Sequence, residues 1–134
     1  MPFSLTLLNL QQRTTYSVNL DNLQGLTSGL MSVQPDSDVG VTATEKPSIG
    51  YSWAVMSNTC GDRMTLVNDD MTKLLTATSN LMGGDSYQRE FTFQSPSAAA
   101  NYVKEPCSIT FAYKRPWLSE PDSPNDVKTV FFNI

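Results

Sequence analysis

Cys107-Ser-Ile-Thr-Phe-Ala-Tyr-Lys-Arg-Pro-Trp117 opens with the alternation of apolar and polar side chains that is typical of a β-strand with one buried face. Proline fixes its own φ and disfavours helix at the preceding residue, so we expect an extended Arg115 at the end of the strand. Trp117 is thereby carried into a loop. Tryptophan and arginine are enriched at binding hot spots, which makes this loop a candidate contact surface. The alternative is a loop tryptophan that folds back to cover the core.

The same alternation recurs along the chain and is interrupted by turn residues such as Gln34-Pro-Asp-Ser and Glu120-Pro-Asp-Ser-Pro-Asn. Seven or more short strands with this spacing predict an all-β fold, an immunoglobulin-like antiparallel β-sandwich. Trp53 lies within an alternating segment, so we expect it in the core. Besides the strand before Arg115, the segments with this pattern are 3–7, 16–20, 39–44, 51–55, 64–66, 91–93 and 127–134.

Two segments fit the strand pattern less well. Residues 23–34 contain two glycines, no charges and no clear period, and are interpreted as an insertion or an irregular edge. Residues 71–75 fit a short helical turn and a strand equally well.

The size and composition of the chain indicate a single globular domain spanning residues 1–134. Of its 134 residues, 40% are hydrophobic and 16% are charged, and the net charge of -4 argues against a nucleic-acid or anionic-membrane partner. No apolar run approaches the roughly 20 residues of a membrane span. The apolar start, Met1-Pro-Phe-Ser-Leu-Thr-Leu-Leu, lacks a basic segment and a cleavage site, so we expect a first strand rather than a signal peptide. The compartment stays open between the cytoplasm and a secretory or vesicular route with a trimmed leader.

The chain has no histidine, which removes Ser-His-Asp and Cys-His catalytic arrangements and histidine metal sites. Two cysteines, Cys60 and Cys107, are too few for a four-thiolate zinc site; we expect two free buried thiols, with one disulfide as the alternative. The acidic pairs Asp69-Asp70 and Asp122/Asp126 are interpreted as solvated loop residues. We therefore expect no enzymatic activity, no metal and no cofactor.

Three loops stand out in chain order. The first loop, residues 46–51, lies in Lys46-Pro-Ser-Ile-Gly-Tyr-Ser-Trp53; the second loop, residues 81–86, is Leu81-Met-Gly-Gly-Asp-Ser86; the third loop is Arg115-Pro-Trp117. Together they resemble the N-P-T-T-G-[YF]-x-W, G-x-G-G and R-P-W loops of the chagasin-like inhibitors of papain-family cysteine proteases. The resemblance covers residues 37–134, whereas residues 1–36 are a longer, divergent portion.

The resemblance implies a reversible, tight-binding inhibitor that blocks the active-site cleft of a papain-like, cathepsin L-like protease with its three loops. In the family, the threonines of the first loop approach the catalytic cysteine. Here Ile49 has no hydroxyl group to donate, so we expect it to fill an apolar subsite. Leu81 replaces the first glycine of the second loop and limits the freedom of the backbone there.

The alternative from another class is an adhesion or carbohydrate-binding β-sandwich that has no effect on proteases. The residues expected to contact the protease are Lys46, Pro47, Ser48, Ile49, Gly50, Tyr51, Met82, Gly83, Gly84, Arg115, Pro116 and Trp117.

Overall fold

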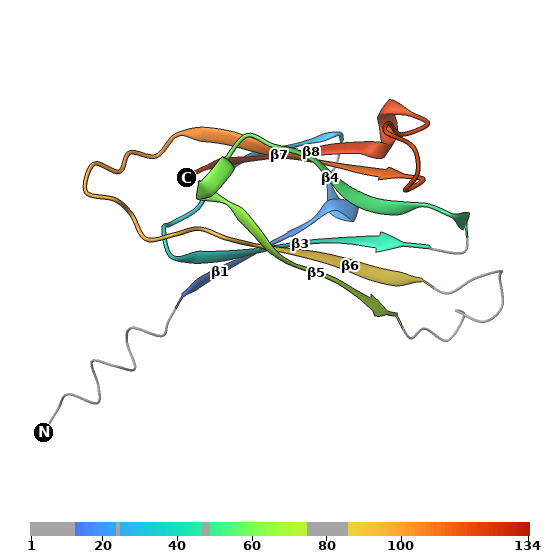
Figure 1. Cartoon of the computed structure of the whole chain (residues 1–134), viewed down its shortest axis with the longest axis horizontal. Helices are drawn as coiled ribbons and strands as arrows, with labels where there is room; N and C mark the ends of the chain where they lie inside the picture. Colours follow the sequence, from blue (N-terminus) through green and yellow to red (C-terminus); the bar gives the residue numbers. More distant parts are fainter. Residues whose placement is uncertain (1–12, 24, 47–48, 75–85) are drawn as a thin grey trace, which may run out of the picture.

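The chain forms two four-stranded β-sheets that pack face to face (Figure 1). The computed structural model describes residues 13–23, 25–46, 49–74 and 86–134, and this part of the chain contains no α-helix. The prediction of an all-β, immunoglobulin-like sandwich is confirmed. In spatial order, the first sheet holds β1 (Thr14–Asn19), β3 (Ser37–Glu45), β6 (Tyr87–Gln94) and β5 (Thr65–Lys73). The second sheet holds β2 (Thr27–Ser32), β8 (Val127–Asn133), β7 (Pro106–Lys114) and β4 (Ser52–Asn58). Short 3-10 helices in the described part of the chain include η1 (Leu20–Asn22), η3 (Gly61–Arg63) and η4 (Pro124–Asp126).

The core lies between the sheets and is built from the inward-facing residues that the alternation predicts. Phe91 and Phe93 of β6 meet Phe111 of β7, with ring centroids 5.4 Å and 6.1 Å apart. All three rings are at most 2% exposed, and full burial of such a side chain stabilises a fold by about 1.5–3 kcal/mol. These aromatic contacts hold the two sheets together at mid-length.

Trp53 is a core residue, as predicted. Its side chain is 8% exposed, and its ring centroid lies 5.1 Å from that of Tyr113 on the neighbouring strand. The indole Nε1–H donates to the carbonyl of Thr44 at 2.9 Å, so the polar atom of this buried ring is satisfied.

The N-terminal part of the described chain supplies an edge strand to each sheet. β1 pairs with β3 and β2 pairs with β8, both in parallel, whereas the other four strand pairings are antiparallel. Within residues 23–34, β2 therefore forms an edge strand, with a register irregularity between Thr27 and Leu30. The expectation of antiparallel pairing holds for the other four pairings and fails for the edge strands β1 and β2.

Strand β5 corrects two interpretations. Met71 belongs to β5, which continues to Lys73, so the strand alternative is right for the described part of residues 71–75. Asp69 and Asp70 also lie in β5 and not in a loop, and Asp69 forms an ion pair with Arg89 at 2.8 Å. The partner is distant in sequence, so the local turn-like composition gave the wrong prediction. Asp122 and Asp126 do lie in the connection between β7 and β8.

Some predictions concern residues outside the described ranges, including the first strand expected at residues 3–7. Among the described residues, no helix has the length and apolar character needed to cross a membrane.

The two cysteines form a disulfide, so the prediction of free thiols is wrong. β4 pairs with β7 up to Asn58 and Ile109, and Thr59 N–H donates to the carbonyl of Ser108 at 2.8 Å. This pairing continues to Cys60 and Cys107, whose Cα atoms are 5.0 Å apart, within the range a disulfide requires. Strand register between distant segments creates the bond, and sequence spacing alone does not reveal it.

We expect the double substitution Cys60→Ala/Cys107→Ala to lower the free energy of unfolding by about 2–4 kcal/mol, because it reopens a large loop in the unfolded chain. The residues are 47 positions apart. Urea unfolding of both proteins, with and without reductant, measures the effect. Reductant should destabilise the wild-type protein and leave the double variant unchanged; a wild-type midpoint that does not respond to reductant would contradict the prediction.

Candidate functional site

Three connections between strands leave the sandwich at the same end (Figure 1). At the end of β3, Glu45 is opposite Tyr87 at the start of β6, and Tyr87 is opposite Lys73 at the end of β5. In the other sheet, Ser52 at the start of β4 is opposite Lys114 at the end of β7. The strand ends that bound the β3–β4, β5–β6 and β7–β8 connections therefore share one end of the molecule. We call it the loop end.

The described part of the first loop is held by backbone hydrogen bonds. Ile49 N–H donates to the carbonyl of Lys46 at 3.2 Å, and Lys46 N–H donates to the hydroxyl of Tyr113 at 3.0 Å. Gly50 has a φ of 82°, a conformation that glycine adopts without steric cost. Ile49 is 57% exposed at the tip of this braced segment.

The third loop is a tight turn that displays Trp117. Leu118 N–H donates to the carbonyl of Arg115 at 3.0 Å, which places Pro116 at the second position of a β-turn, where proline is favoured. The ammonium group of Lys114 donates to the carbonyl of Leu118 at 2.7 Å and closes the turn from the strand side. Trp117 is 72% exposed, so it does not fold back to cover the core.

The first and third loops touch each other. A Cβ atom placed on Gly50 would lie 4.0 Å from the ring of Trp117, and the guanidinium of Arg115 lies 5.4 Å from the ring centroid of Tyr51. Gly50 therefore lies near Trp117, and Ile49 precedes Gly50 in the chain, so the two adjoining loops each display a large exposed apolar side chain. We call these three residues the apolar strip.

Five of the predicted contact residues lie outside the described ranges, so their placement stays a prediction. The strands that flank the second loop are described as far as Leu74 and Ser86, where Leu74 N–H donates to the carbonyl of Ser86 at 2.9 Å. The five residues are Pro47, Ser48, Met82, Gly83 and Gly84.

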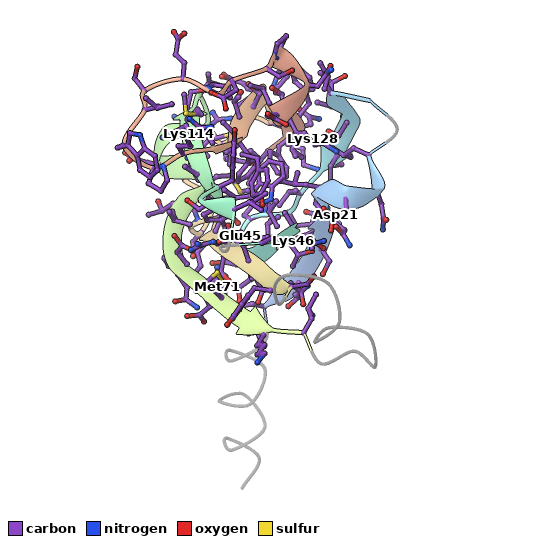
Figure 2. The ribbon with its side chains drawn as sticks, turned by 90° about the vertical axis from the view of Figure 1, so that its right-hand side faces the viewer. Asp21, Glu45, Lys46, Met71, Lys114 and Lys128 are labelled. Atoms are coloured by element: carbon purple, nitrogen blue, oxygen red, sulfur yellow. A yellow bond between two sulfur atoms is a disulfide. The ribbon has the colours of Figure 1, made fainter. Side chains whose placement is uncertain are left out.

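A buried ion pair between Glu45 and Arg89 lies at the base of the loop end, between the two sheets. Glu45 is 1% exposed, and its carboxylate lies 2.7 Å from Nη2 of Arg89 and also accepts from Nε of that guanidinium at 3.1 Å. The same carboxylate accepts from Trp53 N–H, the backbone of the opposite sheet, at 2.7 Å. The hydrogen bonds to Glu45 hold the pKa of Arg89 above its ordinary value. Figure 2, which faces the loop end, shows Glu45 near the centre of the molecule beside Lys46.

Sequence analysis missed the residues that brace the loops, namely Glu45, Tyr113 and Lys114. One sequence signal existed for Glu45: it follows Val39, Val41 and Ala43 at the inward-facing spacing of β3, and a carboxylate at such a position needs donors. Nothing in the sequence pairs Tyr113 or Lys114 with a particular loop carbonyl or amide.

The described residues contain no group of three or more His, Cys, Asp or Glu side chains that could hold a metal ion. At the loop end, the described apolar side chains of Ile49 and Trp117 face solvent. Such a surface is suited to binding.

Residues 32–134 match the model of the chagasin family of peptidase inhibitors, I42, and this match covers more than half of the chain. The chain belongs to the chagasin family. The sequence-based prediction of a chagasin-like protein is thereby confirmed. A comparison with curated protein sequences found no match.

Solved structures of similar fold agree with this assignment. The cysteine protease inhibitor EhICP2 from Entamoeba histolytica has a TM-score of 0.68 at 16% identity, over 92% of this chain and 97% of that chain. Amebosin has a TM-score of 0.55 at 17% identity, over 91% and 98% of the two chains. PbICP-C, solved in complex with falcipain-2, has a TM-score of 0.53 at 10% identity, over 88% and 96%. At these identities, the likeness establishes a common fold.

We expect Glu45→Ala to lower the free energy of unfolding by about 3–5 kcal/mol, because it leaves the Arg89 charge without its buried partner. The matched control is Asp69→Ala, which removes the other, 44% exposed carboxylate from the same guanidinium and should cost less than about 1 kcal/mol. Chemical denaturation of both variants measures the difference. Equal losses for the two would contradict a special role for Glu45.

Proposed function

We propose that this chagasin-family protein is a reversible, tight-binding inhibitor of papain-like cysteine proteases that blocks the active-site cleft with the loops of its loop end. The observation that carries the proposal is the apolar strip, in which Ile49 and Trp117 come from separate loops and are displayed together. Membership of a peptidase-inhibitor family supplies the target class. The inhibitor itself carries out no reaction in this mechanism, in keeping with the family.

Inhibition would depend on loops that already hold Ile49 and Trp117 in their binding positions in the free protein. The turns that hold Ile49 and Trp117 are closed by hydrogen bonds in the free protein, so part of the ordering cost of binding is met beforehand. Ile49 would occupy an apolar subsite close to the catalytic cysteine, and Trp117 would pack against an apolar or aromatic wall of the cleft. Because the first loop is held in its own turn, it would not offer a scissile bond in a reactive pose.

The remaining predicted residues have proposed roles beside this strip. Lys46 and the unplaced Pro47 and Ser48 would enter the cleft with Ile49. The glycine backbone of Met82-Gly83-Gly84 would approach the protease closely on the other flank. Arg115 and Pro116 would hold Trp117 in position.

The solved relatives support a cysteine protease as the partner. EhICP2 is a cysteine protease inhibitor, and PbICP-C was solved in complex with falcipain-2. We also propose that residues 1–134 act as one inhibitor domain, which the pairing of β1 with β3 and of β2 with β8 supports.

The direct test is an active-site titration of papain and of cathepsin L with the purified protein. We expect a stoichiometric loss of peptidase activity against a small fluorogenic peptide, with activity recovered on dilution because inhibition is reversible. Full activity of several papain-like proteases at micromolar inhibitor would reject the proposal and leave the adhesion or carbohydrate-binding alternative.

We expect Trp117→Ala to weaken inhibition by about 2 kcal/mol or more, roughly a 30-fold rise in the inhibition constant, because it removes the largest exposed anchor. The matched control is Val103→Ala, an apolar residue 66% exposed that precedes β7 at the other end of the sandwich. Inhibition constants and thermal unfolding are measured for both variants. Identical inhibition constants for the two would show that Trp117 takes no part in binding.

A further inference from the structure

Tyr51 lies at the junction of the first and third loops, and its ring is held on two sides. The ring centroid of Tyr113, on β7, lies 5.5 Å away, and the guanidinium of Arg115 lies 5.4 Å from the centroid of Tyr51. Tyr113 and Arg115 are two residues apart, at the end of β7 and just after it. The ring of Tyr51 therefore packs against β7 and the start of the third loop as well as lying in the first loop.

Asp122 completes this junction from further along the β7–β8 connection. Its carboxylate accepts a hydrogen bond from the hydroxyl of Tyr51, and the same Oδ2 lies 3.9 Å from the guanidinium of Arg115. The hydrogen bond to Asp122 raises the pKa of the Tyr51 phenol, while the charge of Arg115 opposes the shift. Bonds to an ionised acceptor are stronger than neutral ones, so this contact is directional as well as attractive.

The Tyr51–Arg115–Asp122 cluster adjoins the apolar strip. Tyr51 follows Gly50 in the chain, and Arg115 begins the turn that displays Trp117. An ion pair as exposed as that of Arg115 and Asp122, with 46% and 43% of the side chains accessible, contributes little alone. The cluster matters because it links the first loop to the third loop, which are far apart in the sequence.

We propose that Asp122 is a positioning residue that fastens the first loop to the third loop through Tyr51, so that Ile49 and Trp117 meet a protease as one rigid surface. This inference rests on the proposed inhibitory function. Asp122 acts on binding through Tyr51 and Arg115 and not by touching the protease. Loss of the cluster would leave each loop folded and free to move relative to the other, which raises the ordering cost of binding.

The experiment uses Tyr51→Phe, Asp122→Ala and the double variant in the full chain. Tyr51→Phe keeps the ring between Tyr113 and Arg115 and removes only the hydroxyl. The matched control is Glu120→Ala, which removes an equal charge from the same connection, where Glu120 has no polar contact among the described residues. Inhibition constants are measured against papain, and backbone order at Ile49 and Gly50 is measured by nitrogen-15 NMR relaxation in the free inhibitor.

We expect each single variant to raise the inhibition constant about tenfold, with no further rise in the double variant, since both remove the same bond. Backbone order at Ile49 and Gly50 should fall in all three, with melting temperatures unchanged, and Glu120→Ala should change nothing. Multiplicative effects in the double variant, or an Asp122→Ala protein identical to Glu120→Ala, would overturn the inference. If the wild-type protein inhibits no protease, the proposed function fails by itself. The relaxation data then still decide whether Asp122 fixes the first loop: lower order in Asp122→Ala supports that role, and unchanged order rejects it.

Discussion

The loop end depends on the hydrogen bonds that the buried carboxylate of Glu45 accepts. This carboxylate is buried where the phenylalanine-rich core gives way to loops, and a carboxylate in that position requires donors. Arg89 supplies them from β6 of the same sheet, and the backbone N–H of Trp53 supplies one from β4 of the other sheet. The first loop begins next to Glu45 and ends two residues before Trp53, so one side chain holds the strands on both sides of the loop. A loop anchored in this way keeps its shape without a large core of its own.

The opposite end of the sandwich is secured by different chemistry. The Cys60–Cys107 disulfide ties the end of β4 to the start of β7, and the guanidinium of Arg63 donates to the carbonyl of Ile134 at 2.6 Å. A disulfide therefore closes this end, and hydrogen bonds to Glu45 hold the loop end. The aromatic contacts between the sheets stabilise the region between the two ends. The division fits a binding protein, because the end that meets a partner needs its loops placed accurately, whereas the far end needs only to stay closed.

Local sequence pattern was enough to predict most of the strands and the core, since burial of one face imposes a period of two on residues such as Ile109 and Phe111. It failed wherever two distant segments had to be brought together. Free cysteines were predicted because strand register at Cys60 and Cys107 is not encoded locally. Asp69 was assigned to a loop because its partner, Arg89, lies on another strand. The three candidate loops were found from their residue types, but the side chains that brace them, such as Lys114, depend on tertiary contacts.

The departures of the first loop from the family pattern are best understood against this scaffold. Ile49 stands where a threonine is usual, yet its N–H closes a turn to the carbonyl of Lys46, and it precedes Gly50, a glycine with a positive φ that lies near the exposed indole of Trp117. A change at such a tip alters the chemistry offered to a partner and leaves the supporting contacts of Lys46 and Tyr113 intact. An exposed isoleucine and an exposed tryptophan on adjoining loops favour a cleft with apolar walls over one that recognises a hydroxyl group. In the proposed mode of inhibition, the scaffold would fix how the inhibitor binds, and position 49 would be where selection among proteases can act.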